Sequence, residues 1–244
     1  MSVEVELREL CTRYRAEPIR MLPARYGFVV AVAATDARLV MKASADPWGA
    51  YQAEVAIALA ALGVGPTVHE HVVTETGTWT VMEHVLPGSP LEKVEASTVE
   101  ALATMFHSMA SQSAPTTELP MLNDWLRDRL VGHDVSDLAP GRQQAPLTER
   151  QRALAMLGDL GDCHDGLCHG DTSPQNVLLG PDGRMFFIDP RGVRGEVSYD
   201  AAVLALKVAP YAEPRTIAIQ LAKRAGLPAE RVEAWTVVAD AARV

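Results

Sequence analysis

The residues that decide the fold are His-Gly-Asp-Thr-Ser-Pro-Gln-Asn at positions 169–176. Within this octapeptide Asp171 and Asn176 stand five residues apart, and Pro174 between them favours an irregular loop over a helix. Taken alone, a His-Gly-Asp triplet usually marks a turn. The sequence on either side of the octapeptide therefore determines how it is interpreted.

A second acidic residue follows Asn176 by thirteen positions, at the end of an apolar stretch. Residues 177–180 and 185–188 flank Pro-Asp-Gly-Arg at 181–184, and this pattern predicts a β-hairpin. The hairpin would return Asp189 toward Asn176. Amide and carboxylate oxygens suit Mg²⁺, which takes few protein ligands and keeps several waters. The sequence therefore predicts a magnesium site formed by Asn176 and Asp189.

The first third of the chain is rich in predicted strands. After a weak helical pattern, the apolar residues 27–34 and 39–42 flank a short polar turn and predict a hairpin that ends in Lys42. Residues 69–73 and 79–85 predict a second hairpin in the same way.

One helix is predicted between these two hairpins. Asp46 as N-cap and Pro47 at the first helical position open it, and Gly63 ends it. Glu54 lies on this helix. A lysine such as Lys42, held by a glutamate on the next helix, would orient the α- and β-phosphates of a nucleotide.

The second part of the chain is rich in predicted helices. A Pro/Gly cluster at residues 86–90 is the predicted boundary between the two parts. The helical signals beyond it are a capping box at residues 97–100 before a helix at 101–110, a helix capped by Thr148 that runs to Leu160, and helical sequence after Tyr199 with breaks at Pro210, Pro214 and residues 226–228. The order is therefore strands first and helices second, with one hairpin inside the helical part.

Composition excludes several classes of protein. The 244 residues are 48% apolar and 22% charged, which is ordinary for a folded soluble protein. The formal net charge of −9 argues against nucleic acid as a partner, because phosphate binding needs a basic face, and it permits attraction of a cationic substrate. No apolar run approaches the roughly 20 residues of a membrane-spanning helix. Three cysteines form no disulfide-rich framework, so we expect a cytoplasmic protein.

Three motifs together resemble the aminoglycoside phosphotransferase family, whose members share a two-lobed fold with protein kinases. They are the octapeptide at 169–176, Phe-Ile-Asp-Pro-Arg-Gly at 187–192 and Gly-Glu-Val-Ser-Tyr-Asp at 195–200, and the last two are similar to segments of streptomycin-type kinases. The resemblance runs from about residue 25 to residue 207. It implies an α+β fold with a small β-rich N-terminal lobe that carries one helix and a larger helical C-terminal lobe.

The resemblance also implies a division of labour between the lobes. Residues 1–85 would bind the nucleotide, residues 86–90 would form the hinge, and residues 91–244 would carry the catalytic loop and the acceptor site. Asp171 would then be the catalytic base. The other implied site residues in this lobe are the magnesium ligands Asn176 and Asp189, and His169 and Asp200, which would support the loop.

In the N-terminal lobe, Lys42 and Glu54 match the phosphate-binding lysine and its helix partner. Met82, Glu83 and Val85 match the hinge, where backbone groups of Glu83 and Val85 would meet adenine. The loop that covers the phosphates has a single glycine, Gly27, where the family has a glycine-rich run, and about 44 residues follow Asp200, fewer than the family's acceptor-binding helices often use.

The resemblance implies an enzyme that moves the γ-phosphate of ATP or GTP, with Mg²⁺, to a hydroxyl of a small cationic molecule. An aminoglycoside-like antibiotic is the expected acceptor, and no protein partner is implied. Two alternatives remain: a metabolite kinase for an amino alcohol or sugar, and a nucleotide-binding module without turnover. The role of Arg191, either an ion-pair partner or a phosphate contact, is left open.

Overall fold

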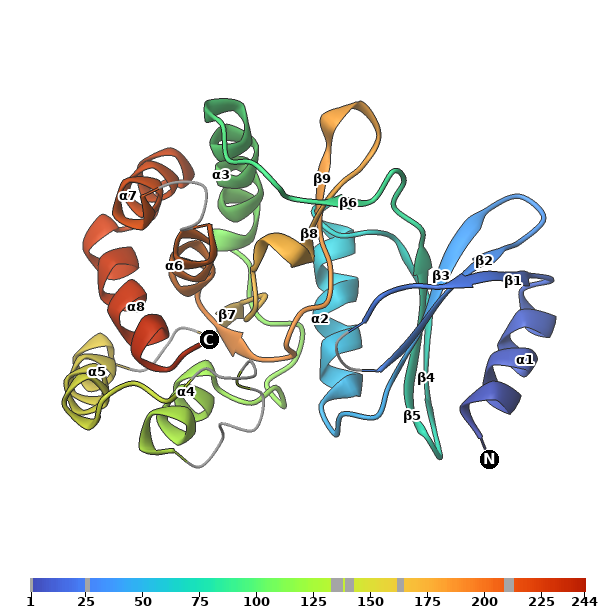
Figure 1. Cartoon of the computed structure of the whole chain (residues 1–244), viewed down its shortest axis with the longest axis horizontal. Helices are drawn as coiled ribbons and strands as arrows, with labels where there is room; N and C mark the ends of the chain where they lie inside the picture. The colour runs from blue at the N-terminus through green and yellow to red at the C-terminus, as the bar shows by residue number, and fades with distance from the viewer. Residues whose placement is uncertain (1, 25–26, 133–137, 139–142, 162–164, 209–212) are drawn as a thin grey trace.

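The computed structural model describes residues 2–24, 27–132, 138, 143–161, 165–208 and 213–244. Two lobes lie side by side: a β-sheet flanked by helices on the right of Figure 1 and a group of helices on the left, with helix α2 between them. This arrangement confirms the predicted α+β, two-lobed fold class.

The sheet lobe contains five antiparallel strands in the order β1-β2-β3-β5-β4. The strands are β1 (Glu17–Met21), β2 (Phe28–Ala33), β3 (Arg38–Ser44), β4 (Val68–Thr74) and β5 (Gly77–Glu83). Both predicted hairpins are present, as β2 with β3 and β4 with β5. Strand β1 has no counterpart among the predictions: it is only five residues long, contains Pro18, and is exposed at all five positions.

Two helices cover opposite faces of this sheet (Figure 1). Helix α1 (Val3–Arg13) packs Leu10 and Cys11 into a cluster with the apolar side chains of β2, β3 and β5. Helix α2 (Gly49–Ala61) lies on the other face, where its Val55 and Leu59 belong to the hydrophobic core of the helical lobe. Helix α2 therefore belongs to the core of the helical lobe, which is separate from the cluster under α1. Helix α1 lies where the sequence has its weak helical pattern, so the sheet lobe carries two helices and not the one expected.

Helix α2 begins at Gly49 and not at the predicted Pro47. The Oδ1 atom of Asp46 accepts the N–H of Trp48 at 2.8 Å, and its carbonyl accepts the N–H of Gly49 at 2.8 Å. Asp46 therefore closes a turn just before the helix and is not its N-cap. Gly63, with φ 71°, follows the end of the helix as predicted.

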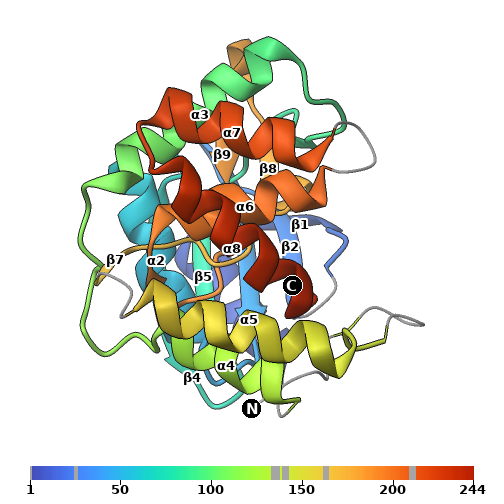
Figure 2. The same ribbon diagram turned by 90° about the vertical axis from the view of Figure 1, so that its left-hand side faces the viewer.

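The helical lobe is built around helix α6. The helices are α3 (Ala96–Ala110), α4 (Leu122–Val131), α5 (Leu147–Leu160), α6 (Val197–Lys207), α7 (Pro214–Ala225) and α8 (Ala229–Ala241). Residues 197–205 of α6 are all buried, and α7 and α8 pack against α6 (Figure 2). The segment after residue 196 therefore forms the core of this lobe.

Two further predicted helix caps, both in the helical lobe, are wrong. Helix α3 begins at Ala96, so the expected capping box at residues 97–100 lies inside its first turn. Helix α5 begins at Leu147, which puts Thr148 inside that helix as well. Pro214 is the first residue of α7, the position where proline costs no helical hydrogen bond. The break predicted at Pro210 lies outside the described residues.

Short strands connect the lobes. Strands β6 (Ser89–Pro90), β8 (Val177–Leu179) and β9 (Met185–Phe187) form a three-stranded sheet, and β7 (Gly166–Leu167) pairs with β10 (Arg194–Gly195). The pairing of β8 with β9 confirms the third predicted hairpin. The N–H of Phe187 donates to the carbonyl of Val64 at 2.7 Å, a backbone link between β9 and the segment after α2. The lobe boundary at residues 86–90 stays a prediction.

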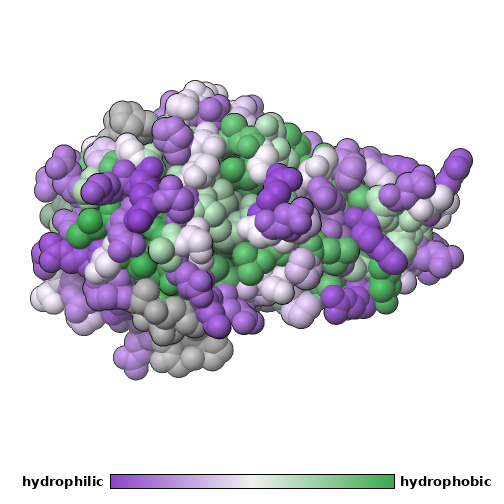
Figure 3. Space-filling model, turned by 90° about the horizontal axis from the view of Figure 1, so that it is seen from above, coloured by the Kyte–Doolittle hydropathy of each residue, from purple (hydrophilic) through white to green (hydrophobic). Residues whose placement is uncertain are grey.

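The molecular surface differs between its two ends and its middle. In the view from above, hydrophilic residues predominate at both ends with apolar patches among them, and apolar surface is most continuous across the middle, where the lobes meet in Figure 1 (Figure 3). Within the described residues, no helix has both the length and the apolarity required to cross a bilayer.

A buried carboxylate attaches α1 to the sheet. The side chain of Glu6 is 2% exposed and accepts hydrogen bonds from Thr74 Oγ1 at 2.9 Å, Trp79 Nε1 at 2.7 Å and the Thr76 hydroxyl. Burial opposes ionisation of Glu6, but these hydrogen bonds outweigh it and hold the pKa of the carboxyl below its usual value.

We expect Glu6→Ala to lower the free energy of unfolding by roughly 3 kcal/mol, because it leaves several donors without an acceptor. Urea unfolding measures this loss, and Glu9→Ala, an exposed acid on the same helix, is the matched control. Since the folded-state pKa of Glu6 is depressed, its contribution is present above the usual carboxyl pKa and is lost as the pH falls through the folded value. Equal stability of Glu6→Ala and Glu9→Ala would contradict this assignment.

Candidate active site

The first turn of α6 holds the octapeptide in place. Asp200 is fully buried, and its two carboxylate oxygens accept the N–H groups of His169 and Gly170 at 2.8 Å each. The hydroxyl of Thr172 donates to the Asp200 carbonyl at 2.6 Å. These three contacts attach the loop to the first turn of α6, and the supporting role of Asp200 in the active site stays a prediction.

His169 is buried and links the loop to the segment after β9. Its Nε2 atom lies 2.9 Å from the Ile188 carbonyl, which can only accept, and its Nδ1 atom lies 3.2 Å from the N–H of Asp171, which can only donate. The ring is therefore neutral, with its proton on Nε2. Burial also lowers the pKa of His169, against the attraction of the nearby carboxylate of Asp171.

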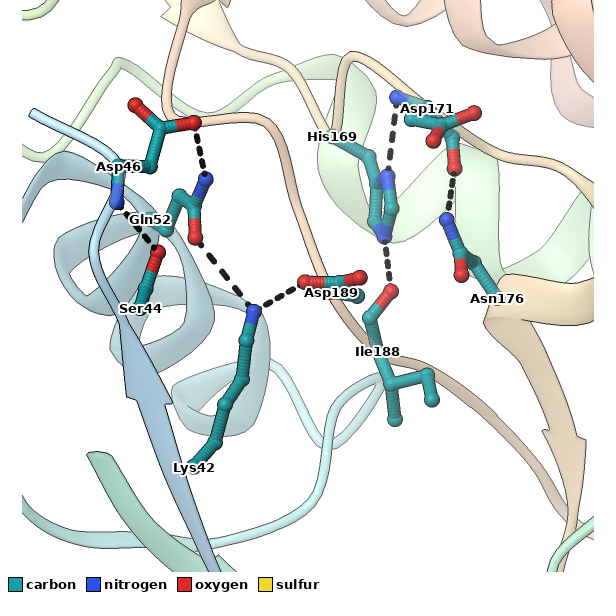
Figure 4. Close-up of polar contacts among 9 residues, drawn as sticks. All are labelled: Lys42, Ser44, Asp46, Gln52, His169, Asp171, Asn176, Ile188 and Asp189. Carbon is teal, nitrogen blue, oxygen red and sulfur yellow. Dashed lines mark hydrogen bonds and ion pairs between the residues drawn. The ribbon is translucent and has the colours of Figure 1, made fainter. Parts of the chain in front are cut away.

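Asp171 and Asn176 lie on the same side of the loop (Figure 4). The Nδ2 atom of Asn176 donates to the carbonyl of Asp171 at 2.8 Å, so the amide nitrogen is used within the loop. Pro174–Asn176 form a single 3-10 turn, and the N–H of Ile188 donates to the Asn176 carbonyl at 2.9 Å. The structure thus brings the chain just before Asp189 next to Asn176, as the predicted hairpin required.

Lys42 and Asp189 meet from opposite lobes. Lys42 lies on β3, and its Nζ atom forms an ion pair with Asp189 Oδ1 (Figure 4). The lysine side chain is 16% exposed and the aspartate side chain 52% exposed, so the carboxylate faces the solvent between the lobes. Asp189 has φ 58°, a left-handed conformation that aspartate tolerates better than most residues.

The structure does not bring Glu54 to Lys42. Glu54 Oε1 lies 3.7 Å from His71 Nε2, whereas Lys42 Nζ lies 3.4 Å from Gln52 Oε1. Residues two apart are separated by about 200° around the helix axis, which puts them on nearly opposite sides of the helix. Gln52 and Glu54 therefore cannot both contact Lys42. The predicted pairing of Lys42 with Glu54 is therefore corrected: Gln52 occupies the place expected of the glutamate.

The predicted hinge residues follow the end of β5. Met82 pairs with Val40 and Glu83 with Leu39 in the sheet, while Val85 lies beyond the strand and is buried. The N–H of Glu83 donates to the Thr67 carbonyl at 2.8 Å and is therefore occupied within the protein. A contact of the Glu83 and Val85 backbone with adenine stays a prediction.

Arg191, whose role the sequence left open, packs against His169 and Gly170 at the start of the octapeptide. Its N–H donates to the His169 carbonyl at 2.8 Å, and its guanidinium lies 4.2 Å from the centre of the Trp125 ring. A β-carbon on Gly170 would lie 2.9 Å from the Arg191 Cβ atom. Arg191 therefore packs against the backbone of the octapeptide and helps to hold it in position.

Sequence reasoning missed several residues around the site. Gln52 has no distinguishing signal, and Thr172 lies inside the octapeptide without an assigned role. Glu196, from the motif at 195–200, is buried and accepts from Arg231 Nε at 2.6 Å and from the Trp235 indole, which attaches α8 to the start of α6. The acidic residue in that motif could have indicated this contact.

The pKa of Asp200 gives a prediction about stability. Burial raises the pKa of this carboxyl from 3.8 to about 7, although the N–H groups of His169 and Gly170 oppose the shift. The folded protein therefore keeps a proton that the unfolded chain has released, and this group makes the free energy of unfolding fall as the pH rises from 3.8 to about 7. The slope is at most about 1.4 kcal/mol per pH unit.

Asp200→Asn removes this titration. We expect the difference in unfolding free energy between wild type and variant, measured in urea, to shrink as the pH rises from about 5 to about 8. A difference that stays constant over this range would show that Asp200 does not titrate there.

The donors at the site fit Mg²⁺. Asn176 and Asp189 offer one amide and one carboxylate oxygen, and within the described residues no group of three or more histidine, cysteine, aspartate or glutamate side chains converges as a metal cage. Mg²⁺ is commonly held by one or two such protein ligands together with substrate phosphates.

A sheet lobe and a helical lobe with this strand order and this loop define a protein-kinase-like fold. Residues 21–238 match the family described as "Phosphotransferase enzyme family". The chain belongs to this family, and the predicted resemblance and the assignment as a phosphotransferase enzyme are confirmed.

Solved structures with the same fold include two kinds of small-molecule kinase. An aminoglycoside-3'-phosphotransferase of type VIII is 21% identical with TM-score 0.65, and 98% of each chain is covered. Choline kinase LicA from Streptococcus pneumoniae is 15% identical with TM-score 0.68, covering 98% of this chain and 87% of that one. An aminoglycoside phosphotransferase from Streptomyces rimosus, in complex with ADP and streptomycin, is 18% identical with TM-score 0.63, covering 100% and 99%. No curated protein matches the chain.

Proposed function

We propose that this enzyme moves the γ-phosphate of ATP or GTP to a hydroxyl of a small cationic molecule, with an aminoglycoside-like antibiotic as the first candidate. The observation that carries the proposal is the meeting of Lys42 and Asp189 from opposite lobes beside the loop of Asp171 and Asn176 (Figure 4). These four side chains supply the parts that phosphoryl transfer requires.

Each residue has a role in this proposal. Lys42 orients the α- and β-phosphates, and the segment from Met82 to Val85 holds the base. Asn176 and Asp189 would hold Mg²⁺, which when bound neutralises charge on the phosphates. His169 and Asp200 keep the loop in shape through the contacts described above.

Asp171 orients the acceptor hydroxyl and receives its proton late in the reaction. The acceptor oxygen forms a bond to the γ-phosphorus while the bond from that phosphorus to the β,γ-bridging oxygen breaks, so the nucleoside diphosphate leaves. This chemistry depends mainly on positioning and on stabilised charge, which a loop fixed by buried hydrogen bonds supplies.

A cationic acceptor is supported by charge. The chain carries a net charge of −9, and Asp171 and Asp189 both reach the surface between the lobes. The 44 residues after Asp200 include α7 and α8, which pack around α6 as core. Two surface hollows, of about 190 and 360 Å³, lie away from Asp171. An acceptor bound beside Asp171 would therefore meet acidic groups at the surface.

The structural neighbours favour a second candidate, a kinase for an amino alcohol. Choline kinase LicA covers as much of the chain as the type VIII aminoglycoside enzyme does. Both acceptors carry a cationic nitrogen and a hydroxyl, so the same acidic groups suit either of them.

A phosphate-transfer screen tests the proposal. Purified protein is incubated with Mg-ATP or Mg-GTP and, separately, with aminoglycosides, cationic peptide antibiotics and amino alcohols, and phosphorylated product is measured. Product with aminoglycosides, together with protection of a susceptible bacterium that expresses the protein, supports the first candidate. Product only with amino alcohols supports the second. Stabilisation by Mg-nucleotide without product in any mixture indicates a nucleotide-binding module without turnover.

A further inference from the structure

Gln52 connects Lys42 to a carboxylate on the loop before α2. Its Oε1 atom lies 3.4 Å from Lys42 Nζ, and its Nε2 atom lies 3.5 Å from Asp46 Oδ2 (Figure 4). Asp46 is itself fixed, because its Oδ1 atom accepts the N–H of Trp48 at 2.8 Å and its own N–H donates to Ser44 Oγ at 3.3 Å. The three side chains thus form a chain from the ammonium group to the carboxylate.

The order of donors along this chain allows one arrangement only. An ammonium group can only donate and a carboxylate can only accept, whereas an amide has one end of each kind. Asp46 therefore turns the amide nitrogen of Gln52 toward itself and presents the amide oxygen to Lys42. A glutamate at position 52 would instead place its carboxylate within hydrogen-bond distance of the Asp46 carboxylate, and the repulsion between two negative charges would destabilise this arrangement.

The backbone of Gln52 also touches the loop that carries Asp189. Gly192, with φ 81°, lies so close to α2 that a β-carbon on it would be 2.7 Å from the Gln52 nitrogen. The same residue therefore contacts Lys42 by its side chain and the Asp189 loop by its backbone. Lys42 has a long, flexible side chain, and its contact with Gln52 can hold that side chain in one conformation.

We propose that Gln52, oriented by Asp46, is the positioning residue that sets Lys42 for the nucleotide phosphates, and that the neutral amide is required because Asp46 is charged. This inference rests on the proposed function and names a partner for Lys42 that is not the helix glutamate. Because the amide is neutral, Lys42 keeps its full charge for Asp189 in the free protein and for the phosphates when nucleotide binds.

A set of five variants tests it: Gln52→Met, Gln52→Glu, Asp46→Asn, the double variant Gln52→Glu with Asp46→Asn, and the control Glu54→Gln. Affinity for Mg-ATP and Mg-GTP is measured by calorimetry, KM and kcat are measured with any acceptor that is phosphorylated, and the melting temperature without nucleotide reports on folding. Calorimetry needs no knowledge of the acceptor.

We expect Gln52→Met to raise the nucleotide Kd and KM about tenfold, with a smaller change in kcat and an unchanged melting temperature. Gln52→Glu alone should weaken binding similarly. Adding Asp46→Asn should restore binding to within about threefold of wild type, since the amide introduced by that substitution can donate to the new carboxylate. Glu54→Gln should match wild type, because Glu54 points away from Lys42.

Two results would overturn the inference alone: wild-type affinity in Gln52→Met while the wild type binds nucleotide, or a double variant that binds no better than Gln52→Glu. If the second result came with a lower melting temperature in Gln52→Met, the role of Gln52 would be structural. A wild-type protein that binds neither nucleotide would refute the proposed function and this inference with it.

Discussion

Asp171→Ala is expected to lower kcat by about 10²–10⁴-fold while leaving the Kd for Mg-nucleotide within about twofold of wild type. The carboxylate is the proposed base, and it lies on a loop whose backbone is held by Asp200, His169 and Asn176 and not by the Asp171 side chain itself. Removing this side chain therefore takes away proton transfer and hydroxyl orientation without disturbing the loop. Steady-state kinetics with the best acceptor from the screen, together with nucleotide titration, measure both effects.

The matched control for this variant is Asp124→Ala. Asp124 is an exposed carboxylate on α4 whose ion pair is with Arg127 one turn later, so its loss costs little. We expect wild-type kinetics for it. If Asp171→Ala transferred phosphate at the wild-type rate, the role of base would have to be given to another group.

Asp189→Asn is expected to raise the Kd for Mg-nucleotide by at least about 10–100-fold, the range found when even the outer partners of a metal site are removed. Asparagine has the same shape and tolerates the left-handed backbone at φ 58°, so the variant tests the charge and not the fold. The loss should be confined to the metal complex. Titration with nucleotide in the presence of Mg²⁺ and in the presence of a chelator separates the two contributions.

Asp182→Asn controls for both the substitution and the backbone. Asp182 also has a left-handed conformation, with φ 56°, and it is exposed in the turn between β8 and β9. We expect no change in nucleotide affinity for this variant. An Asp189→Asn variant with unchanged affinity for Mg-nucleotide would remove Asp189 from the proposed metal site.

The parts of the fold that were predictable from sequence are those with a strong local signal. The hairpin of β8 and β9 has a Pro-Asp-Gly turn between two apolar runs, and its closure brings Asp189 back toward Asn176. The hairpin of β2 and β3 places Lys42 on its second strand in the same way. The proximity of these residues therefore follows from turn chemistry, while their roles stay predictions.

The side of α2 that faces Lys42 was not predictable. The helix is rich in alanine and carries apolar residues on every side, so no amphipathic stripe indicates its rotation about its axis. Sequence favours Glu54 because it is the acidic residue on that helix, whereas packing against the sheet on one side and the helical lobe on the other decides which side faces Lys42. The misplaced caps of α3 and α5 have another cause: both helices begin at exposed residues, Ala96 and Leu147, where local sequence signals locate a helix end only to within one or two residues.

The contact of Lys42 with Asp189 changes what nucleotide affinity means for this protein. In the free molecule each of these charges already has a partner, and the pair spans the two lobes. Under the proposed function, binding of Mg-nucleotide is an exchange, in which the lysine leaves the carboxylate for phosphate and the carboxylate leaves the lysine for the metal. The measured affinity is then the free energy of the new contacts with the nucleotide and the metal, less the free energy lost when the ion pair of Lys42 with Asp189 breaks. A Lys42→Met variant would release Asp189 as well as weaken phosphate binding, so its affinity for the metal ion alone should rise while its affinity for the metal–nucleotide complex falls.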